Sequence, residues 1–184
     1  AANIPHLLPW PQKVAWNGKK FQYRGTFVSL TENFCSIGME QPAGNKITGN
    51  PSSHPALSVK WVEDFPDIPL NRNEAYKLRV TSKGVEIEAI TETGVYRAIQ
   101  TLRQLTEKKG NGIAITGCEI TDWPAFRIRG FMQDVGRTYI STDELKREIA
   151  ILARYKINVF HWHLTENQAW RLQSKVFPMP VSYT

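Results

Sequence analysis

The sequence predicts an α+β layer followed by the first strand–helix–strand unit of a parallel (β/α)8 barrel. In the second part, Arg129–Asp134 and Val159–Leu164 are short apolar runs, and a helix is expected between them from Ser141. Strand, helix and strand in this order form a parallel βαβ unit. In the first part, two alternating strands precede a helix with one apolar face, which is typical of an α+β layer. We place the boundary after Asp122, so the predicted domains are residues 1–122 and 123–184.

The first domain is predicted from its hydrophobic periodicity. Tyr76–Val80 and Val85–Ile90 alternate apolar and polar residues, as half-buried strands do, and Thr81–Gly84 supplies a hairpin turn between them. Thr93 is expected to cap the following helix, and Ile113–Ile115 is expected to return as a strand. The apolar face of that helix consists of Val95, Ala98, Ile99, Leu102 and Leu105.

The second domain begins a barrel that the sequence does not complete. Ser141 followed by Glu144 is a capping-box pattern for the start of a helix. The apolar stripe of that helix consists of Leu145, Ile149, Leu152 and Tyr155. A complete (β/α)8 barrel takes roughly 250 residues, many more than remain after Asp122 in a chain of 184. We therefore interpret the chain as a fragment.

Composition limits the possible partners. The chain is 41% hydrophobic and 22% charged, and no apolar run approaches the ~18 residues of a membrane span. The net charge is +6, but the Lys and Arg residues are scattered, so nucleic acid is not an expected partner. Cys35 and Cys118 could be two buried thiols or one disulfide.

Four segments carry a resemblance to a known family. Arg129–Arg137 and Tyr155–Arg171 closely resemble the first two barrel strands of β-N-acetylhexosaminidases, the chitobiase-like family twenty of the glycoside hydrolases. Leu8–Gln12 and Gly94–Leu105 resemble the N-terminal domain of that family. The resemblance implies a domain like domain 2 of the hexosaminidases, followed by the start of a truncated TIM barrel.

The resemblance also implies a reaction. The parent protein would release terminal N-acetylglucosamine or N-acetylgalactosamine from glycans or chito-oligosaccharides, by a retaining, substrate-assisted mechanism without cofactor. The catalytic Asp-Glu pair of the family would lie beyond this chain, so we expect no catalytic residue here and an inactive fragment. Asp143–Glu144 is adjacent in the same order, but it falls in the first turn of a predicted helix. We expect a periplasmic or extracellular location, with any signal peptide already removed.

Arg129 and Glu166 are the predicted substrate-binding residues. By resemblance, Arg129 would hydrogen-bond the hydroxyls of the terminal sugar, and Glu166 would orient the arginine. The alternative for each is a structural ion pair. Glu166-Asn167 stands where the family more often has Asp-Asp, which puts the substrate preference in question. Asp134 and Arg137 are expected to pair with each other.

Two alternative functions and one further expectation remain open from the residues. His161 and His163 share one face of a strand and could hold a metal, as in metal-dependent barrel hydrolases, although we expect them to pack without metal. The chain could instead be a non-catalytic glycan-binding module. Self-association is also expected, because an unfinished barrel edge around Val159–Leu164 would be exposed and apolar.

Overall fold

A computed structural model describes residues 5–35, 56–167, 169–172 and 176. Within this part of the chain, two compact units divide between Arg127 and Ile128. The domain boundary after Asp122 stays a prediction. The elements of the first unit are β1 (Lys13–Tyr23), α1 (Phe27–Cys35), β2 (Leu57–Trp61), the 3₁₀ turn η1 (Arg72–Glu74), β3 (Tyr76–Val80), β4 (Val85–Ala89), α2 (Glu92–Gln104), β5 (Thr106–Lys109) and β6 (Gly112–Asp122). Those of the second are β7 (Gly130–Asp134), α3 (Thr142–Arg154), β8 (Val159–His163), β9 (Thr165–Glu166) and β10 (Ala169–Trp170).

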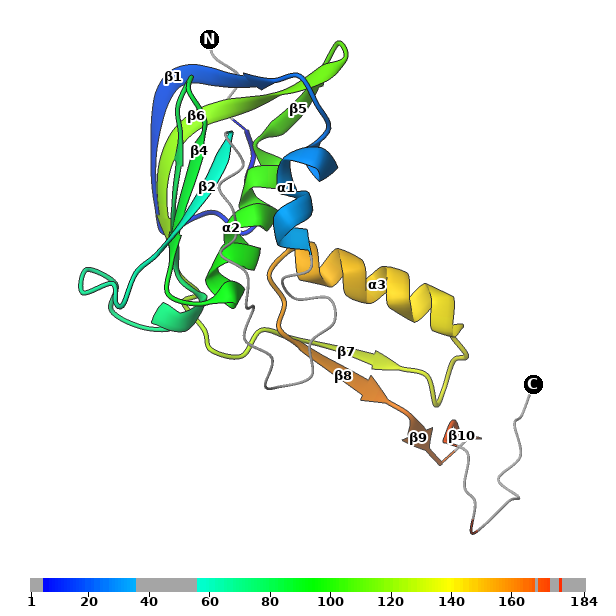
Figure 1. Cartoon of the computed structure of the whole chain (residues 1–184). Helices are drawn as coiled ribbons and strands as arrows, with labels where there is room; N and C mark the ends of the chain where they lie inside the picture. The colour runs from blue at the N-terminus through cyan, green and yellow to red at the C-terminus, as the bar shows by residue number, and fades with distance from the viewer. Residues whose placement is uncertain (1–4, 36–55, 168, 173–175, 177–184) are drawn as a thin grey trace. The chain divides into compact units, whose positions relative to one another are not determined.

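The first unit is a sheet with α2 along one face (Figure 1). The strand order is β1-β6-β3-β4-β2, with β5 also pairing with β6, and β2 is parallel to β4. The predicted hairpin is confirmed, since Tyr76 pairs with Ala89 and Val80 with Val85. Because alternate side chains of β3, β4 and β6 point toward α2, the helix and the sheet bury one common apolar core. The fold predicted for the first domain is therefore confirmed.

The start of α2 differs from the prediction. The N-cap is Thr91, whose hydroxyl accepts a hydrogen bond from Gly94 N at 3.4 Å, and Thr93 lies inside the helix. Thr91 has the extended backbone of an N-cap residue, with φ −132° and ψ 164°. Gly94 is required here because a Cβ at this position would lie 2.5 Å from the Ala75 carbonyl oxygen. The close approach of α2 to the chain before β3 thus depends on a residue without a side chain.

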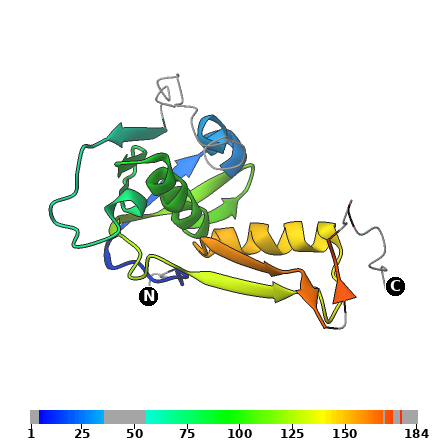
Figure 2. The ribbon, with the colours of Figure 1, turned by 90° about the horizontal axis from the view of Figure 1, so that it is seen from below.

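The second unit contains the predicted βαβ arrangement. β7 and β8 are parallel neighbours, with Gly130 opposite Val159 and Asp134 opposite His163, and α3 runs alongside both (Figures 1 and 2). Ser141 caps α3 by accepting a hydrogen bond from Glu144 N at 3.2 Å, as predicted. β9 and β10 form a short antiparallel hairpin directly after β8.

Much of the apolar surface of the second unit is exposed. Of the stripe predicted on α3, Leu145 is buried, whereas Ile149 and Tyr155 are 45% and 47% exposed. On the strands, Val159 and Trp162 are 40% and 46% exposed. The β7–α3–β8 arrangement leaves these side chains in contact with water.

Among the described residues, no helix combines the length and the apolar composition needed to span a bilayer. Cys118 is a buried free thiol on β6. The side chain of Cys35 lies outside the described part of the structure.

Candidate sugar-binding site

Arg129 lies at the amino end of the β7–β8 pair. Its backbone N–H donates to Asn158 Oδ1 at 2.8 Å, and its Nε donates to the Lys156 carbonyl at 2.8 Å. Both partners belong to the segment that leads from α3 into β8. The Arg129 side chain is therefore directed to the turn before β8.

Glu166 lies at the other end of the same strands, after His163, the last residue of β8. Four residue steps along β7 correspond to about 13 Å, at roughly 3.3 Å per residue. Arg129 and Glu166 therefore flank opposite ends of the strands, and their predicted roles in binding substrate stay predictions. In parallel α/β barrels the active site forms at the carboxyl ends, which is the end that carries Glu166.

Asp134 organises the turn at the carboxyl end of β7. Its Oδ1 accepts hydrogen bonds from Gly136 N at 2.8 Å and Arg137 N at 3.2 Å, and its Oδ2 accepts one from Arg137 Nε. The expected pairing of Asp134 with Arg137 is therefore confirmed. The Asp134 side chain is only 13% exposed, whereas that of Arg137 is 59% exposed.

The charges in this turn are stabilised by each other. Burial alone would raise the pKa of the Asp134 carboxyl, but the hydrogen bonds from the Arg137 side chain and the two backbone N–H groups outweigh burial and lower that pKa. The hydrogen bond to Asp134 in turn raises the pKa of Arg137. Asp134 is therefore an ionised acceptor that orients a permanently charged, exposed guanidinium.

His163 and Glu166 lie beside this turn. His163 Nε2 is 3.5 Å from Glu166 Oε1, is buried, and has no hydrogen-bond partner among the described residues. Glu166 Oε2 accepts a hydrogen bond from Asn167 N at 3.0 Å. A Cβ at Gly136 would lie 2.9 Å from the Glu166 Cβ, so the absence of a side chain at position 136 allows Glu166 to approach the turn.

The metal alternative finds only partial support in this geometry. Ligand atoms of Asp134, His163 and Glu166 lie within 4.8 Å of one another and could hold a cation. His161, the other half of the predicted metal pair, is exposed and outside this group. Both Asp134 oxygens already accept hydrogen bonds from the turn that carries Arg137. A cation would have to displace those bonds and lie beside a guanidinium, so the residues fit a metal poorly.

The arrangement suits hydroxyl recognition. A guanidinium has five N–H donors in a fixed plane and a carboxylate offers two acceptor oxygens, so Arg137 and Glu166 together match the donor–acceptor pattern of vicinal sugar hydroxyls. From the sequence, Arg137 was assigned to a structural pair with Asp134 and was not selected as a candidate substrate-binding residue. It could have been found from its position just after the carboxyl end of the first barrel strand, where barrel sites form.

Asp143 and Glu144 are positioned as predicted, in the first turn of α3. The Asp143 carboxylate is 83% exposed and lies 3.9 Å from Lys146 Nζ. These two carboxylates stabilise the amino end of the helix and take no part in the site.

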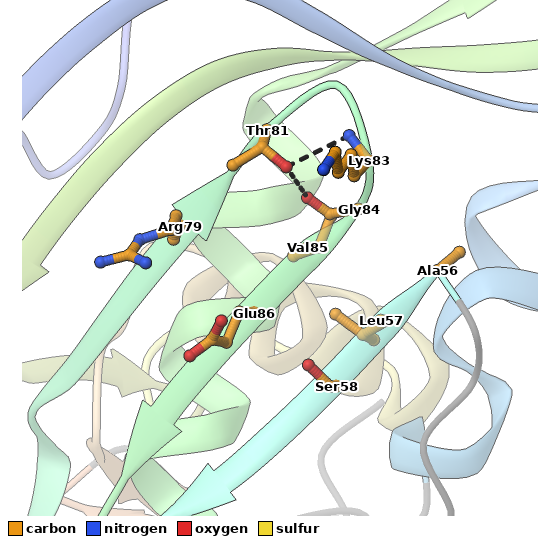
Figure 3. A pocket seen from close by; sticks show the side chains of 9 residues that line it. All are labelled: Ala56, Leu57, Ser58, Arg79, Thr81, Lys83, Gly84, Val85 and Glu86. Atoms are coloured by element: carbon orange, nitrogen blue, oxygen red, sulfur yellow. Dashed lines mark hydrogen bonds between the residues drawn. The ribbon is translucent and has the colours of Figure 1, made fainter.

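A shallow hollow of about 210 Å³ lies at the β3–β4 hairpin of the first unit (Figure 3). Thr81 Oγ1 accepts a hydrogen bond from Lys83 N at 3.1 Å and donates one to the Gly84 carbonyl at 3.4 Å, so this hydroxyl stabilises the turn. Arg79 pairs across the sheet with Glu119 at 3.4 Å. Thr81 and Arg79 in the lining of this hollow thus serve the hairpin turn and the sheet.

An α+β domain followed by a parallel βαβ unit, with charged side chains at its carboxyl end, is the arrangement predicted for the start of a (β/α)8 barrel. Residues 5–123 match the model of glycosyl hydrolase family 20, domain 2, and residues 126–181 match that of the glycosyl hydrolase family 20 catalytic domain. The chain therefore belongs to glycosyl hydrolase family 20.

Named relatives and solved structures agree with this family. The chain is 42% identical over 146 residues to a beta-hexosaminidase of Porphyromonas gingivalis, covering 76% of this chain and 17% of the relative. It is 40% identical over 118 residues to a beta-N-acetylhexosaminidase of Cellulomonas fimi, covering 64% and 24%. The structure of a Streptomyces plicatus N-acetyl-beta-hexosaminidase is similar with a TM-score of 0.72 and 26% identity, covering 97% of this chain and 39% of that one. The chain thus spans about a quarter or less of these two curated relatives.

Proposed function

We propose that this chain is part of a β-N-acetylhexosaminidase that releases terminal N-acetylhexosamine from glycans or chito-oligosaccharides. Membership of glycosyl hydrolase family 20, with both family models matched in order along the chain, is the observation that carries the proposal. The names of the relatives, beta-hexosaminidase and beta-N-acetylhexosaminidase, support the same substrate class. The proposed reaction proceeds with retention and uses the acetamido group of the substrate as nucleophile.

Arg137 and Glu166 are the proposed sugar-binding residues of this part of the enzyme. Arg137 is exposed, oriented by Asp134, and located at the carboxyl end of β7. Glu166 follows β8 at the same end, and its Oε1 lies 3.5 Å from His163 Nε2. This assignment replaces Arg129 with Arg137 as the arginine that contacts the hydroxyls of the terminal sugar.

The acid/base group of the reaction is proposed to come from another part of the enzyme. A general acid must be protonated near the working pH, whereas the hydrogen bonds at Asp134 lower the pKa of its carboxyl. The exposed pair Asp143–Glu144 lies in the first turn of α3, where carboxylates stabilise the positive end of the helix dipole. We therefore expect no turnover by the 184-residue chain alone.

A periplasmic or extracellular location is proposed as well, because glycans and chito-oligosaccharides are found mainly outside the cytoplasm. Cell fractionation of the source organism, with an antibody raised against this chain, checks the location. Recovery in the cytoplasmic fraction alone would contradict it.

Turnover of 4-nitrophenyl N-acetyl-β-D-glucosaminide tests the proposed activity. The full-length protein should release nitrophenol, the 184-residue chain should not, and Arg137→Ala should reduce the activity of the full-length protein. Arg154→Ala, at the exposed end of α3, is the matched control and should leave activity unchanged. A full-length protein that binds N-acetylglucosamine without cleaving the substrate would instead indicate a glycan-binding module.

A further inference from the structure

Arg171 forms hydrogen bonds with two separate backbone segments at the carboxyl end of the strands. Its backbone N–H donates to the Leu164 carbonyl at 3.0 Å, and its Nε donates to the Val135 carbonyl at 2.8 Å. Its guanidinium carbon lies 5.8 Å from the centre of the Tyr139 ring. One arginine therefore contacts the loop after β7 and the segment between β8 and β9.

The two segments are those that carry the proposed sugar-binding residues. Val135 directly precedes the Gly136–Arg137 turn, and its own N–H donates to the His163 carbonyl at 3.0 Å. Leu164 directly precedes β9, whose second residue is Glu166. The backbone of Val135 is thus held on one side by β8 and on the other by Arg171.

The contacts require an arginine. The Nε–H and the terminal N–H groups of a guanidinium are fixed in one plane, so donation from Nε to Val135 sets the direction of the whole group over the Tyr139 ring. A lysine ammonium has no equivalent of Nε and stacks differently on an aromatic face. Arg171→Lys should therefore keep the positive charge and lose the hydrogen bond from Nε to the Val135 carbonyl.

We infer that Arg171 is a positioning residue that fixes the turn carrying Arg137 relative to the hairpin carrying Glu166. Arg171 acts through these two residues and is not assigned a contact with the sugar. The effect of Arg171 on substrate turnover rests on the proposed function. Its contacts with the two backbone segments do not depend on that function.

Hydrogen exchange on the 184-residue chain tests whether Arg171 fixes the loop after β7 relative to the segment between β8 and β9. In Arg171→Ala and Arg171→Lys, the Val135 and Gly136 amides should exchange about 3- to 10-fold faster, the size expected for the loss of one hydrogen bond. Exchange at Leu102, buried on α2, should be unchanged, and so should exchange at Val135 in Arg154→Ala. Unchanged exchange at Val135 in both Arg171 variants would overturn the inference.

Kinetics of the full-length protein test the consequence for substrate. Arg171→Ala should lower kcat/KM for 4-nitrophenyl N-acetyl-β-D-glucosaminide about 10-fold, yet less than about 2-fold further in an Arg137→Ala background, because residues that act as one unit are not additive. Equal losses in both backgrounds would mean a merely structural role and would overturn the positioning. If the full-length protein has no such activity, the proposed function fails. The hydrogen-exchange result still decides whether Arg171 holds the two segments in a fixed relative position.

Discussion

Replacing Tyr76 by Phe removes one hydroxyl from the centre of the first unit. The Tyr76 hydroxyl donates to Asp122 Oδ2 at 2.9 Å and lies 2.6 Å from Thr101 Oγ1. Tyr76 is 1% exposed and Asp122 is 6% exposed, so water cannot easily take the place of the lost group. The same Asp122 carboxylate accepts a hydrogen bond from Gln12 N at 3.1 Å. The hydroxyl therefore links β3, α2 and the end of β6.

The expected loss of stability follows from these partners. A hydrogen bond to a charged group contributes about 1.5–3 kcal/mol and one between neutral groups about 1 kcal/mol. The ring remains in Tyr76→Phe, so no large cavity forms, and we expect the free energy of unfolding to fall by about 2–4 kcal/mol. That is a large fraction of the ~5–15 kcal/mol that stabilises a typical domain.

Urea denaturation followed by circular dichroism measures this change. Tyr76→Phe should lower the urea midpoint without a change in the slope of the transition. The matched control is Tyr96→Phe on α2, a half-buried ring that faces the Arg97 guanidinium at 5.7 Å, and it should change the unfolding free energy by less than about 0.5 kcal/mol. Equal midpoints for the two variants would refute the buried network.

The same substitution has a defined pH dependence. Burial, reinforced by the neighbouring Asp122 carboxylate, raises the pKa of Tyr76 well above its usual value of about 10. Since the folded pKa exceeds the unfolded one, the contribution of Tyr76 to stability is complete below about pH 10 and is lost as pH rises through the folded pKa. The stability difference between wild type and Tyr76→Phe should therefore be constant near neutrality and shrink above about pH 10. A difference that grows in that range would contradict the sign.

Three further predictions concern the thiol, the histidines and the exposed apolar surface. Burial raises the pKa of Cys118 to about 12, so in a Cys35→Ala chain Ellman's reagent should label this thiol only after unfolding; rapid labelling of the native chain would contradict its burial. Elemental analysis after dialysis should find less than stoichiometric zinc, and stoichiometric zinc lost in a His161→Ala, His163→Ala double variant would favour a metal-dependent hydrolase. Light scattering should detect association of the whole chain but not of a chain that ends at Arg127, since apolar side chains of the second unit are exposed; two clean monomers would count against association through this unit.

The fold could be predicted where a hydrophobic pattern decided it. The β3–β4 hairpin, α2 and the β7–α3–β8 unit were found because alternation and three-to-four spacing mark the buried faces of strands and helices. β1 and α1 were not predicted. The burial of β1 alternates weakly, and a register shift between Trp16 and Lys20 interrupts its pairing with β6, so the pattern is incomplete.

The candidate site was predicted in part. Glu166 was selected because it follows a barrel strand, and the structure places it beside His163. Arg129 was selected through the family resemblance, although Arg129 and Arg137 flank opposite ends of one strand. The contact of Arg171 with Val135 joins residues 36 positions apart. A single sequence carries no signal for such a pairing, because it depends on how the two loops fold at the strand ends.

A crystal structure of the full-length protein with bound N-acetylglucosamine tests the central claim most directly. The sugar should lie at the carboxyl ends of β7 and β8, with hydroxyls within about 3.2 Å of the Arg137 guanidinium and the Glu166 carboxylate. Arg129 should keep its hydrogen bond to the Lys156 carbonyl, without contact to the sugar. A sugar bound to Arg129, or bound away from both Arg137 and Glu166, would contradict the proposed site.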